Sequence, residues 1–198
     1  GDIRSGALPV KTMCLSGHRK YPLGSHDPTL RRKSLEIMQA AIDFSADAGI
    51  RIIQLAGYDV YYETGDGDTR AYFSENLAKC VEMASRAGVY MGFETMETDF
   101  MNSASKADKY VKMINSPYLK IYPDIGNIRN ATEDYLGDLR NVRGDIIAAH
   151  LKETAEGVYR DMEFGQGRVD FEGCINELLA QGVRIFTCEF WYDGKSDP

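Results

Sequence analysis

The stretch GVYMGFE at residues 88–94 holds the pattern that decides the fold. Gly88 ends a segment of helical periodicity, and residues 89–93 form a short apolar run typical of a buried strand. Glu94 follows as an acidic residue where the run ends. The order of helical segment, glycine, apolar run and polar residue recurs along the chain. Such alternation predicts parallel strands joined by helices.

Six apolar runs along the chain, including the one in this stretch, are predicted to be strands. They cover residues 10–15, 50–55, 89–93, 119–122, 146–151 and 183–188. The first helix is expected to open at Asp27-Pro28 and to end at Gly49, and Ser105 with Asp108 is expected to cap the third. Both an open doubly wound sheet and a closed barrel fit this order. No glycine-rich phosphate loop follows the first run, which disfavours the nucleotide-binding open sheet.

Composition restricts the class of protein. With 198 residues, 43% hydrophobic and 27% charged, the chain fits one soluble globular domain. A net charge of −7 and the lack of a long apolar span argue against nucleic acid or a membrane as partner. The four cysteines show no metal-binding spacing, and Cys14 and Cys188 lie in strand-like runs. Buried, reduced thiols in a cytoplasmic protein are therefore expected.

Four successive strands each end in a side chain that can bind a metal ion. These side chains are Glu94, Asp124, His150 and Glu189. The carboxyl ends of barrel strands converge on one face, where active sites are built. Taken singly, each residue has an ordinary explanation as a loop acid, a turn residue or a core histidine. Their recurrence at equivalent positions favours one shared divalent cation, Mn²⁺, Mg²⁺, Co²⁺ or Zn²⁺.

Two glutamates on one ion indicate a particular chemistry. A divalent ion can hold a ketone oxygen and the neighbouring hydroxyl oxygen, and it stabilises the enediolate that forms when the adjacent C–H proton leaves. Glu94 could remove that proton while Glu189 returns one on the opposite face, or the reverse. Epimerisation requires such a pair of bases flanking one carbon.

Four further residues are predicted to contact substrate. His18 follows the first strand in CLSGHRK, and Lys152 lies two residues beyond His150 on the same strand face. A surface lysine is the alternative for Lys152. Gly165 and Gly167 in FGQG have backbone N–H groups that could approach an anion, although a plain turn also explains them.

Several segments of the sequence together resemble a known family. The segments that carry the resemblance occur in the order MCLSGHRKYPLGS, IQLAGYDVYY, ETM with MNS downstream, YPDIGN, AHLKET, FGQGRVDFE and CEFW. Together they resemble the L-ribulose-5-phosphate 3-epimerase (L-xylulose-5-phosphate 3-epimerase) family of bacterial pentose and ascorbate catabolism, one of the xylose-isomerase-like barrels. The family often shows K-D-T after the histidine, whereas this chain has Lys152-Glu153-Thr154, which bears on fine substrate preference.

The resemblance implies a fold and an assembly. It covers nearly the whole chain and implies a single domain, residues 1–198, forming an incomplete (β/α)8 TIM barrel. About six βα units would be present, with the first two strands and the last helix missing. A homodimer in the cytoplasm is expected by the same resemblance.

The resemblance also implies an activity. It places the family's metal ligands on the four strand-end residues and makes Glu94 and Glu189 the acid/base pair. The expected enzyme binds one divalent ion and interconverts L-ribulose 5-phosphate and L-xylulose 5-phosphate, a phosphorylated ketopentose, through an enediolate. A related ketose 3-epimerase, a sugar isomerase or dehydratase on the same barrel, and a non-catalytic sugar-binding module remain alternatives. A nuclease is disfavoured, because only three histidines and a negative net charge are present.

Overall fold

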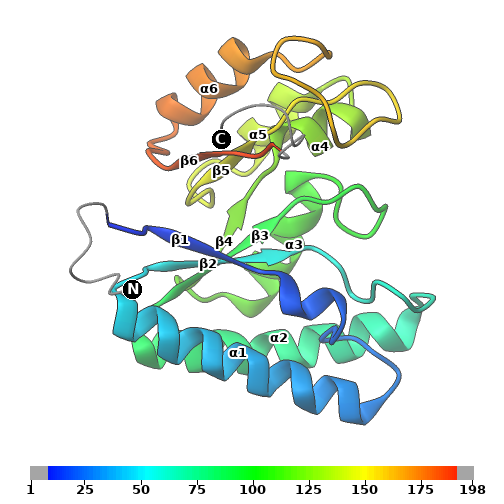
Figure 1. Cartoon of the computed structure of the whole chain (residues 1–198), viewed down its shortest axis with the longest axis vertical. Helices are drawn as coiled ribbons and strands as arrows, with labels where there is room; N and C mark the ends of the chain where they lie inside the picture. The colour runs from blue at the N-terminus through cyan, green and yellow to red at the C-terminus, as the bar shows by residue number, and fades with distance from the viewer. Residues whose placement is uncertain (1–8, 191–198) are drawn as a thin grey trace. The chain divides into compact units, whose positions relative to one another are not determined.

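A computed structural model describes residues 9–190 of the chain and divides it into two compact units (Figure 1). The first unit runs to Phe93 and adds Tyr110–Lys120, and the second holds Glu94–Lys109 and the chain from Ile121 onward. Strands β3 (Tyr90–Glu94) and β4 (Leu119–Tyr122) begin in the first unit and end in the second. The single domain expected over residues 1–198 stays a prediction.

The first unit is built on parallel strands covered by two long helices. Strand β1 (Thr12–Leu15) pairs in parallel with β2 (Ile52–Ala56), and the sheet has the order β1-β2-β3-β4. A short 3-10 helix, η1 (Ser16–Arg19), follows β1. Helices α1 (Pro28–Ala48) and α2 (Gly67–Ala87) pack side by side, as Figure 1 shows.

Local sequence explains where these long helices begin and end. The Asp27 side chain accepts a hydrogen bond from the backbone N–H of Thr29, and Pro28 stands at the first helical position of α1. Gly49 and Gly88 end α1 and α2 in the left-handed region, with φ of 75° and 67°. A side chain with a Cβ rarely adopts that conformation, so glycine is favoured at both positions. The expected limits of α1 are confirmed.

The core of the first unit is apolar and aromatic. The ring of Phe73 on α2 lies 6.0 Å from that of Phe93 on β3 and 5.3 Å from that of Tyr110. Leu77 on α2 and Ile53 on β2 are fully buried with them. Removing such side chains from water is the main source of stability in a folded domain.

The second unit has shorter elements. Its helices are α4 (Ile125–Ala131), α5 (Tyr135–Asn141) and α6 (Phe171–Ala180), and its strands β5 (Ala149–Leu151) and β6 (Phe186–Cys188) pair in parallel. Each helix has an aspartate at its N-cap whose carboxylate accepts a backbone N–H of the first turn, namely Asp124, Asp134 and Asp170. Single bridges join Ile121 to Ile146 and Asp124 to His150.

The structure corrects the expected cap of α3 (Ala104–Ile114). Ser105 lies inside this helix, so the prediction that Ser105 and Asp108 cap it is wrong. The carboxylate of Asp138 instead accepts the backbone N–H groups of Ala104 at 2.6 Å and Ser105 at 3.0 Å. The hydroxyl of Ser103, directly before the helix, accepts the N–H of Lys106 at 3.2 Å, so a local cap and a distant carboxylate together satisfy the free N–H groups of the first turn.

The cysteines are divided between the core and the surface. All four cysteines are free; Cys80 and Cys174 are buried, whereas Cys14 and Cys188 are exposed, which corrects the expectation of buried thiols for these two. Both exposed cysteines lie on edge strands of their sheets, β1 and β6.

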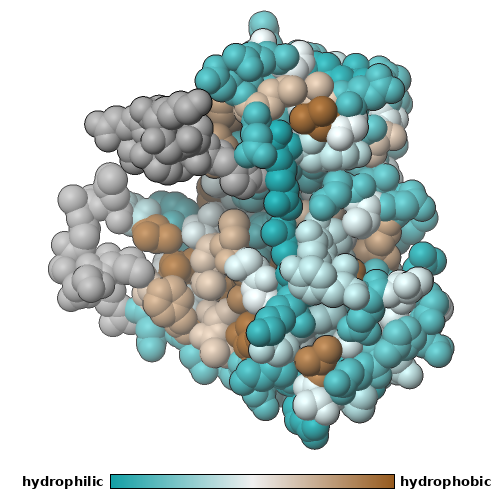
Figure 2. Space-filling model, turned by 45° about the vertical axis from the view of Figure 1, so that its right-hand side comes forward, coloured by the Kyte–Doolittle hydropathy of each residue, from teal (hydrophilic) through white to brown (hydrophobic). Residues whose placement is uncertain are grey.

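The face drawn in Figure 2 is largely hydrophilic. Among the described residues, no helix has both the length and the apolar character of a membrane span.

Candidate metal centre

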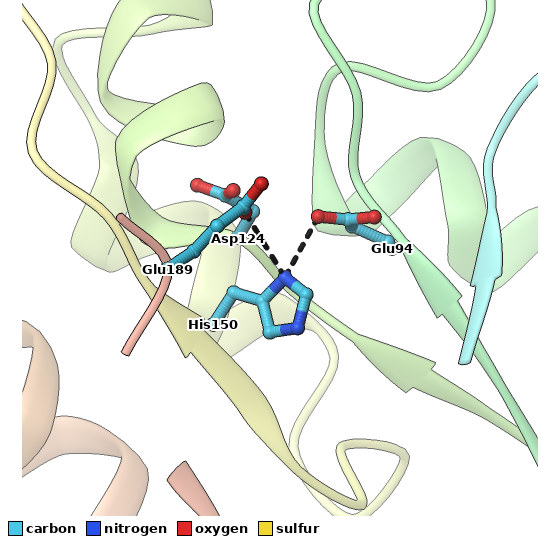
Figure 3. A group of neighbouring side chains, drawn as sticks. All are labelled: Glu94, Asp124, His150 and Glu189. Atoms are coloured by element: carbon cyan, nitrogen blue, oxygen red, sulfur yellow. Dashed lines mark hydrogen bonds and ion pairs between the residues drawn. The ribbon is translucent and has the colours of Figure 1, made fainter. Parts of the chain in front are cut away.

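Four side chains from four strand ends meet in the second unit. Glu94, Asp124, His150 and Glu189 each place one ligand atom within 4.8 Å of the other three. Figure 3 shows the three carboxylates and the imidazole directed toward one another. The juxtaposition expected from the sequence is therefore present, although the residues are far apart along the chain.

Backbone hydrogen bonds set the positions of these residues. The N–H of His150 donates to the carbonyl oxygen of Pro123 at 2.9 Å, which places His150 beside Asp124. The N–H of Glu189 donates to the carbonyl oxygen of Leu151 at 2.9 Å and so continues the β5–β6 pairing. Parallel strands with this register bring their carboxyl ends to one edge, where the side chains gather.

The polar side chains of the cluster contact one another directly. His150 Nδ1 lies 2.8 Å from Glu94 Oε1 and 3.3 Å from Glu189 Oε2. The predicted substrate residue Lys152 also belongs to the cluster, because its Nζ lies 2.6 Å from Asp124 Oδ2 and 3.6 Å from Glu189 Oε2. The ring of Tyr122 packs edge-on against His150, with centroids 4.9 Å apart.

Burial of these charges changes their pKa values. Burial raises the pKa of the Asp124 carboxyl to about 7, against the opposing effect of the Lys152 ammonium. Burial also acts upward on Glu189, but the hydrogen bond from His150 and the charge of Lys152 outweigh it and hold the pKa of Glu189 at about 2. Burial acts downward on Lys152, but the charges of Asp124 and Glu189 prevail and raise its pKa. The cluster thus behaves as a site with an excess of negative charge.

The donor set fits one divalent cation. The cluster holds three carboxylates but one ammonium, so negatively charged groups outnumber positively charged ones when the carboxylates are ionised. Oxygen and nitrogen ligands lie about 2.0–2.2 Å from such ions, so atoms on opposite sides of one ion are about 4 Å apart. The four ligand atoms, which all lie within 4.8 Å of one another, are close to this spacing. Carboxylates with one imidazole suit Mg²⁺, Mn²⁺, Co²⁺ and Zn²⁺ alike, so the donor set does not select among them.

Two buried neutral residues that the sequence did not single out tie the ligands together. Thr95 directly follows Glu94, and its hydroxyl accepts the N–H of Asp124 at 2.9 Å. Asn127 donates from its side chain to the carbonyl oxygen of Thr95 at 2.7 Å, and its backbone N–H donates to Asp124 Oδ1 at 2.9 Å. Both side chains are at most 1% exposed. They hold the ends of β3 and β4 in a fixed relation, as partners of metal ligands commonly do.

The remaining predicted substrate residues lie outside this cluster. Gly165 donates its N–H to Glu153 Oε2 at 2.8 Å, and Gly167 packs against the same side chain. His18 belongs to the first unit, where its Nε2 lies 3.1 Å from the carbonyl oxygen of Ser34, and burial lowers its pKa to about 4. The substrate contacts of His18, Gly165 and Gly167 stay predictions.

The chain is similar to known proteins in sequence and in fold. Residues 3–198 match the family described as xylose isomerase-like TIM barrel. The chain is 46% identical over 190 residues to L-ribulose-5-phosphate 3-epimerase UlaE of Shigella boydii, covering 96% of this chain and 67% of that protein. A structure of L-ribulose 3-epimerase superposes with a TM-score of 0.77 at 20% identity, covering 94% of this chain and 63% of the other. The 3-keto-D-glucoside 4-epimerase YcjR of Escherichia coli superposes with a TM-score of 0.79 at 16% identity, covering 96% of this chain and 76% of the other.

Proposed function

The chain belongs to the L-ribulose-5-phosphate 3-epimerases within the xylose isomerase-like TIM barrels, and from this premise we propose that it interconverts L-ribulose 5-phosphate and L-xylulose 5-phosphate. The reaction inverts C3 of the ketopentose through an enediolate. The expected TIM-barrel fold class and the membership of an epimerase family are confirmed by these comparisons. The chain spans about two thirds of the length of its relatives, so the activity itself is part of the proposal.

One observation supports the chemistry above all others. Glu94 and Glu189 approach the same imidazole nitrogen of His150, at 2.8 Å and 3.3 Å, within a cluster suited to one divalent ion. Two carboxylates that converge on one point can act on the two faces of a carbon held between them. A binding module needs no such pair, and this arrangement therefore favours the epimerase over a non-catalytic protein.

The two glutamates exchange roles during turnover. Glu189, whose pKa is held at about 2, is ionised at neutral pH and accepts the proton from C3. The electron pair of the C–H bond moves into the enediolate, and the protonated Glu94 delivers its proton to the opposite face of C3. Glu189 is then protonated and Glu94 ionised, so the reverse reaction starts from the product state with the roles inverted.

Other groups complete the proposed site. A bound divalent ion, Mn²⁺, Mg²⁺, Co²⁺ or Zn²⁺, supplies Lewis-acid stabilisation of negative charge on the sugar oxygens. Lys152, at 2.6 Å from Asp124, is held with its ammonium among the carboxylates, where it can donate a hydrogen bond to a substrate oxygen. His18, Gly165 and Gly167 are proposed as further substrate contacts from the family pattern. A cytoplasmic homodimer acting in pentose and ascorbate catabolism is inferred on the same basis.

Solvent deuterium tests the reaction. In D₂O with Mn²⁺, the protein should incorporate deuterium at C3 of L-ribulose 5-phosphate while L-xylulose 5-phosphate accumulates, as NMR can follow. Glu94→Gln and Glu189→Gln should each lower kcat by about 10²–10⁴-fold, because acid–base groups contribute effects of this size. The exposed Glu156, which lies outside the cluster, provides the control Glu156→Gln with unchanged turnover.

The outcome separates the alternatives. Deuterium at C1 or C2 would indicate an aldose–ketose isomerase, and loss of water would indicate a dehydratase. No exchange at any carbon, with sugar binding intact, would leave a binding module. Near wild-type turnover in either glutamine variant would contradict the two-base mechanism.

A further inference from the structure

An acidic residue two positions beyond the end of β5 is buried without belonging to the metal cluster. Glu153 follows Lys152 directly and is 3% exposed. A carboxylate is placed in such an environment only when hydrogen bonds replace the water that it loses. The partners of Glu153 therefore indicate what the residue does.

The partners are backbone N–H groups, and two of them come from one loop. Glu153 Oε2 accepts the N–H of Gly165 at 2.8 Å, and Oε1 accepts those of Val169 at 3.2 Å and Thr154 at 3.0 Å. The N–H of Arg168 also donates to the carbonyl oxygen of Thr154 at 2.9 Å. The loop 163–169 is thus fastened to the chain segment that leaves β5, mainly through one carboxylate.

Close packing shows that this attachment is specific. A Cβ added at Gly167 would overlap the carbonyl oxygen of Thr154 and Oε1 of Glu153. Neither atom can move away without giving up a backbone hydrogen bond, so only glycine fits at this position. Gly167 of the FGQG segment therefore allows the loop to lie directly against Glu153.

The attached loop also contacts the residue that follows a metal ligand. The ring of Phe164 lies 5.2 Å from that of Phe171 and 6.5 Å from that of Phe190. Phe190 is bonded to Glu189, one of the two proposed acid/base residues. The loop therefore has a ring contact with the residue next to Glu189, although both rings are partly exposed.

We propose that Glu153 is a positioning residue, which anchors the loop 163–169 and through the Phe164–Phe190 contact fixes the main chain that carries Glu189. The assignment rests on the proposed function for its effect on turnover. The anchoring of the loop does not depend on it. Glu153 touches none of the four ligands, so its effect on the chemistry is exerted through the loop.

The test compares Glu153→Gln with the wild-type protein in three measurements. Hydrogen exchange at the Gly165 and Val169 amides should become about tenfold faster, because an amide side chain has one acceptor oxygen where the carboxylate has two. Mn²⁺ affinity, measured by electron paramagnetic resonance, and kcat should each fall by about tenfold, the lower end of the range for groups that orient metal ligands, because Glu153 acts on Glu189 indirectly; KM should change less. The exposed Glu163 of the same loop provides the control Glu163→Gln, which should match wild type in all three.

A conservative variant and the possible outcomes complete the test. Glu153→Asp keeps the charge on a shorter side chain, and it should recover part of each effect; it also replaces Glu153→Gln if that variant does not fold. Unchanged amide exchange would overturn the anchor. Faster exchange with kcat and Mn²⁺ affinity within twofold of wild type would reduce Glu153 to a purely structural role. If the wild-type protein does not epimerise, the proposed function fails, and amide exchange with Mn²⁺ affinity still decides the proposal.

Discussion

The two units of the chain differ in the length of their helices and in the kind of side chain that they bury. In the first unit, α1 and α2 each have 21 residues, and the buried rings of Phe73 and Phe93 lie in a core that is mainly apolar. In the second unit, α4 and α5 have 7 residues each, and the buried ionisable side chains of Asp124, His150 and Lys152 lie at the strand ends. Stability is concentrated where apolar area is buried, and chemistry where charges are buried at a cost in stability.

The strongest way to break this comparison is to remove apolar volume from the first unit. Phe73→Ala should lower the free energy of unfolding by about 3–5 kcal/mol, because the variant loses buried area and leaves a cavity. Urea denaturation followed by circular dichroism measures the change. The exposed Phe44 on α1 gives the matched control, since Phe44→Ala should stay within about 0.5 kcal/mol of wild type. A small loss for Phe73→Ala would mean that this core is not the main source of stability.

A pH titration of stability tests the effect of the buried histidine in the first unit. His18 in the first unit is neutral, because burial lowers its pKa from 6.5 to about 4. The unfolded chain therefore binds a proton that the folded chain does not, between pH 6.5 and about 4. Above pH 6.5 His18 is neutral in both states and costs no stability. As the pH falls to 4, protonation of the unfolded chain lowers the free energy of unfolding by about 3 kcal/mol.

Variants isolate the part of the pH dependence that comes from His18. The difference in unfolding free energy between pH 7 and pH 4 should shrink in His18→Gln and persist in His26→Gln, whose side chain is 48% exposed. Equal pH dependence in wild type and His18→Gln would show that His18 is not held neutral by burial.

Divalent cations provide a smaller effect, directed at the second unit. Mn²⁺ at 100 times its Kd should stabilise the protein by about 2.7 kcal/mol, measured by thermal unfolding. Amide exchange should slow more at His150 and Glu189 than along α1 and α2. His150→Ala should abolish the response, whereas Asp99→Asn, at a carboxylate 99% exposed in the same unit, should retain it. A response that survives His150→Ala would place the cation elsewhere.

The four ligands could be predicted from the sequence because the alternation of strands and helices shows where each strand ends. Each stands where an apolar run ends, and parallel strands bring such positions together. Thr95 and Asn127 could not be found in this way, because a neutral polar side chain has no distinctive chemistry. Their roles depend on hydrogen-bond partners about thirty positions away, which only the folded chain defines.

The missed helices and the wrong cap have similar physical causes. Helices α4 and α5 complete only two turns, too short for an apolar face to repeat along the sequence. Ser105 and Asp108 have the spacing of a capping box, but the N–H groups at the N-terminus of α3 are satisfied by Ser103 and by the distant Asp138. Tertiary contacts override local signals at such places, whereas the glycine-terminated helices α1 and α2 are set by local sequence and were predicted well.

Asp124 gives its two oxygens to different tasks. Oδ1 caps helix α4 through the N–H of Asn127, and Oδ2 faces the ammonium of Lys152 within the cluster. One carboxylate thus links secondary structure to ion binding, and removing it affects both properties. Natural or laboratory evolution toward a new sugar should therefore leave position 124 unchanged and draw its variation from the loops, where a single residue serves a single purpose.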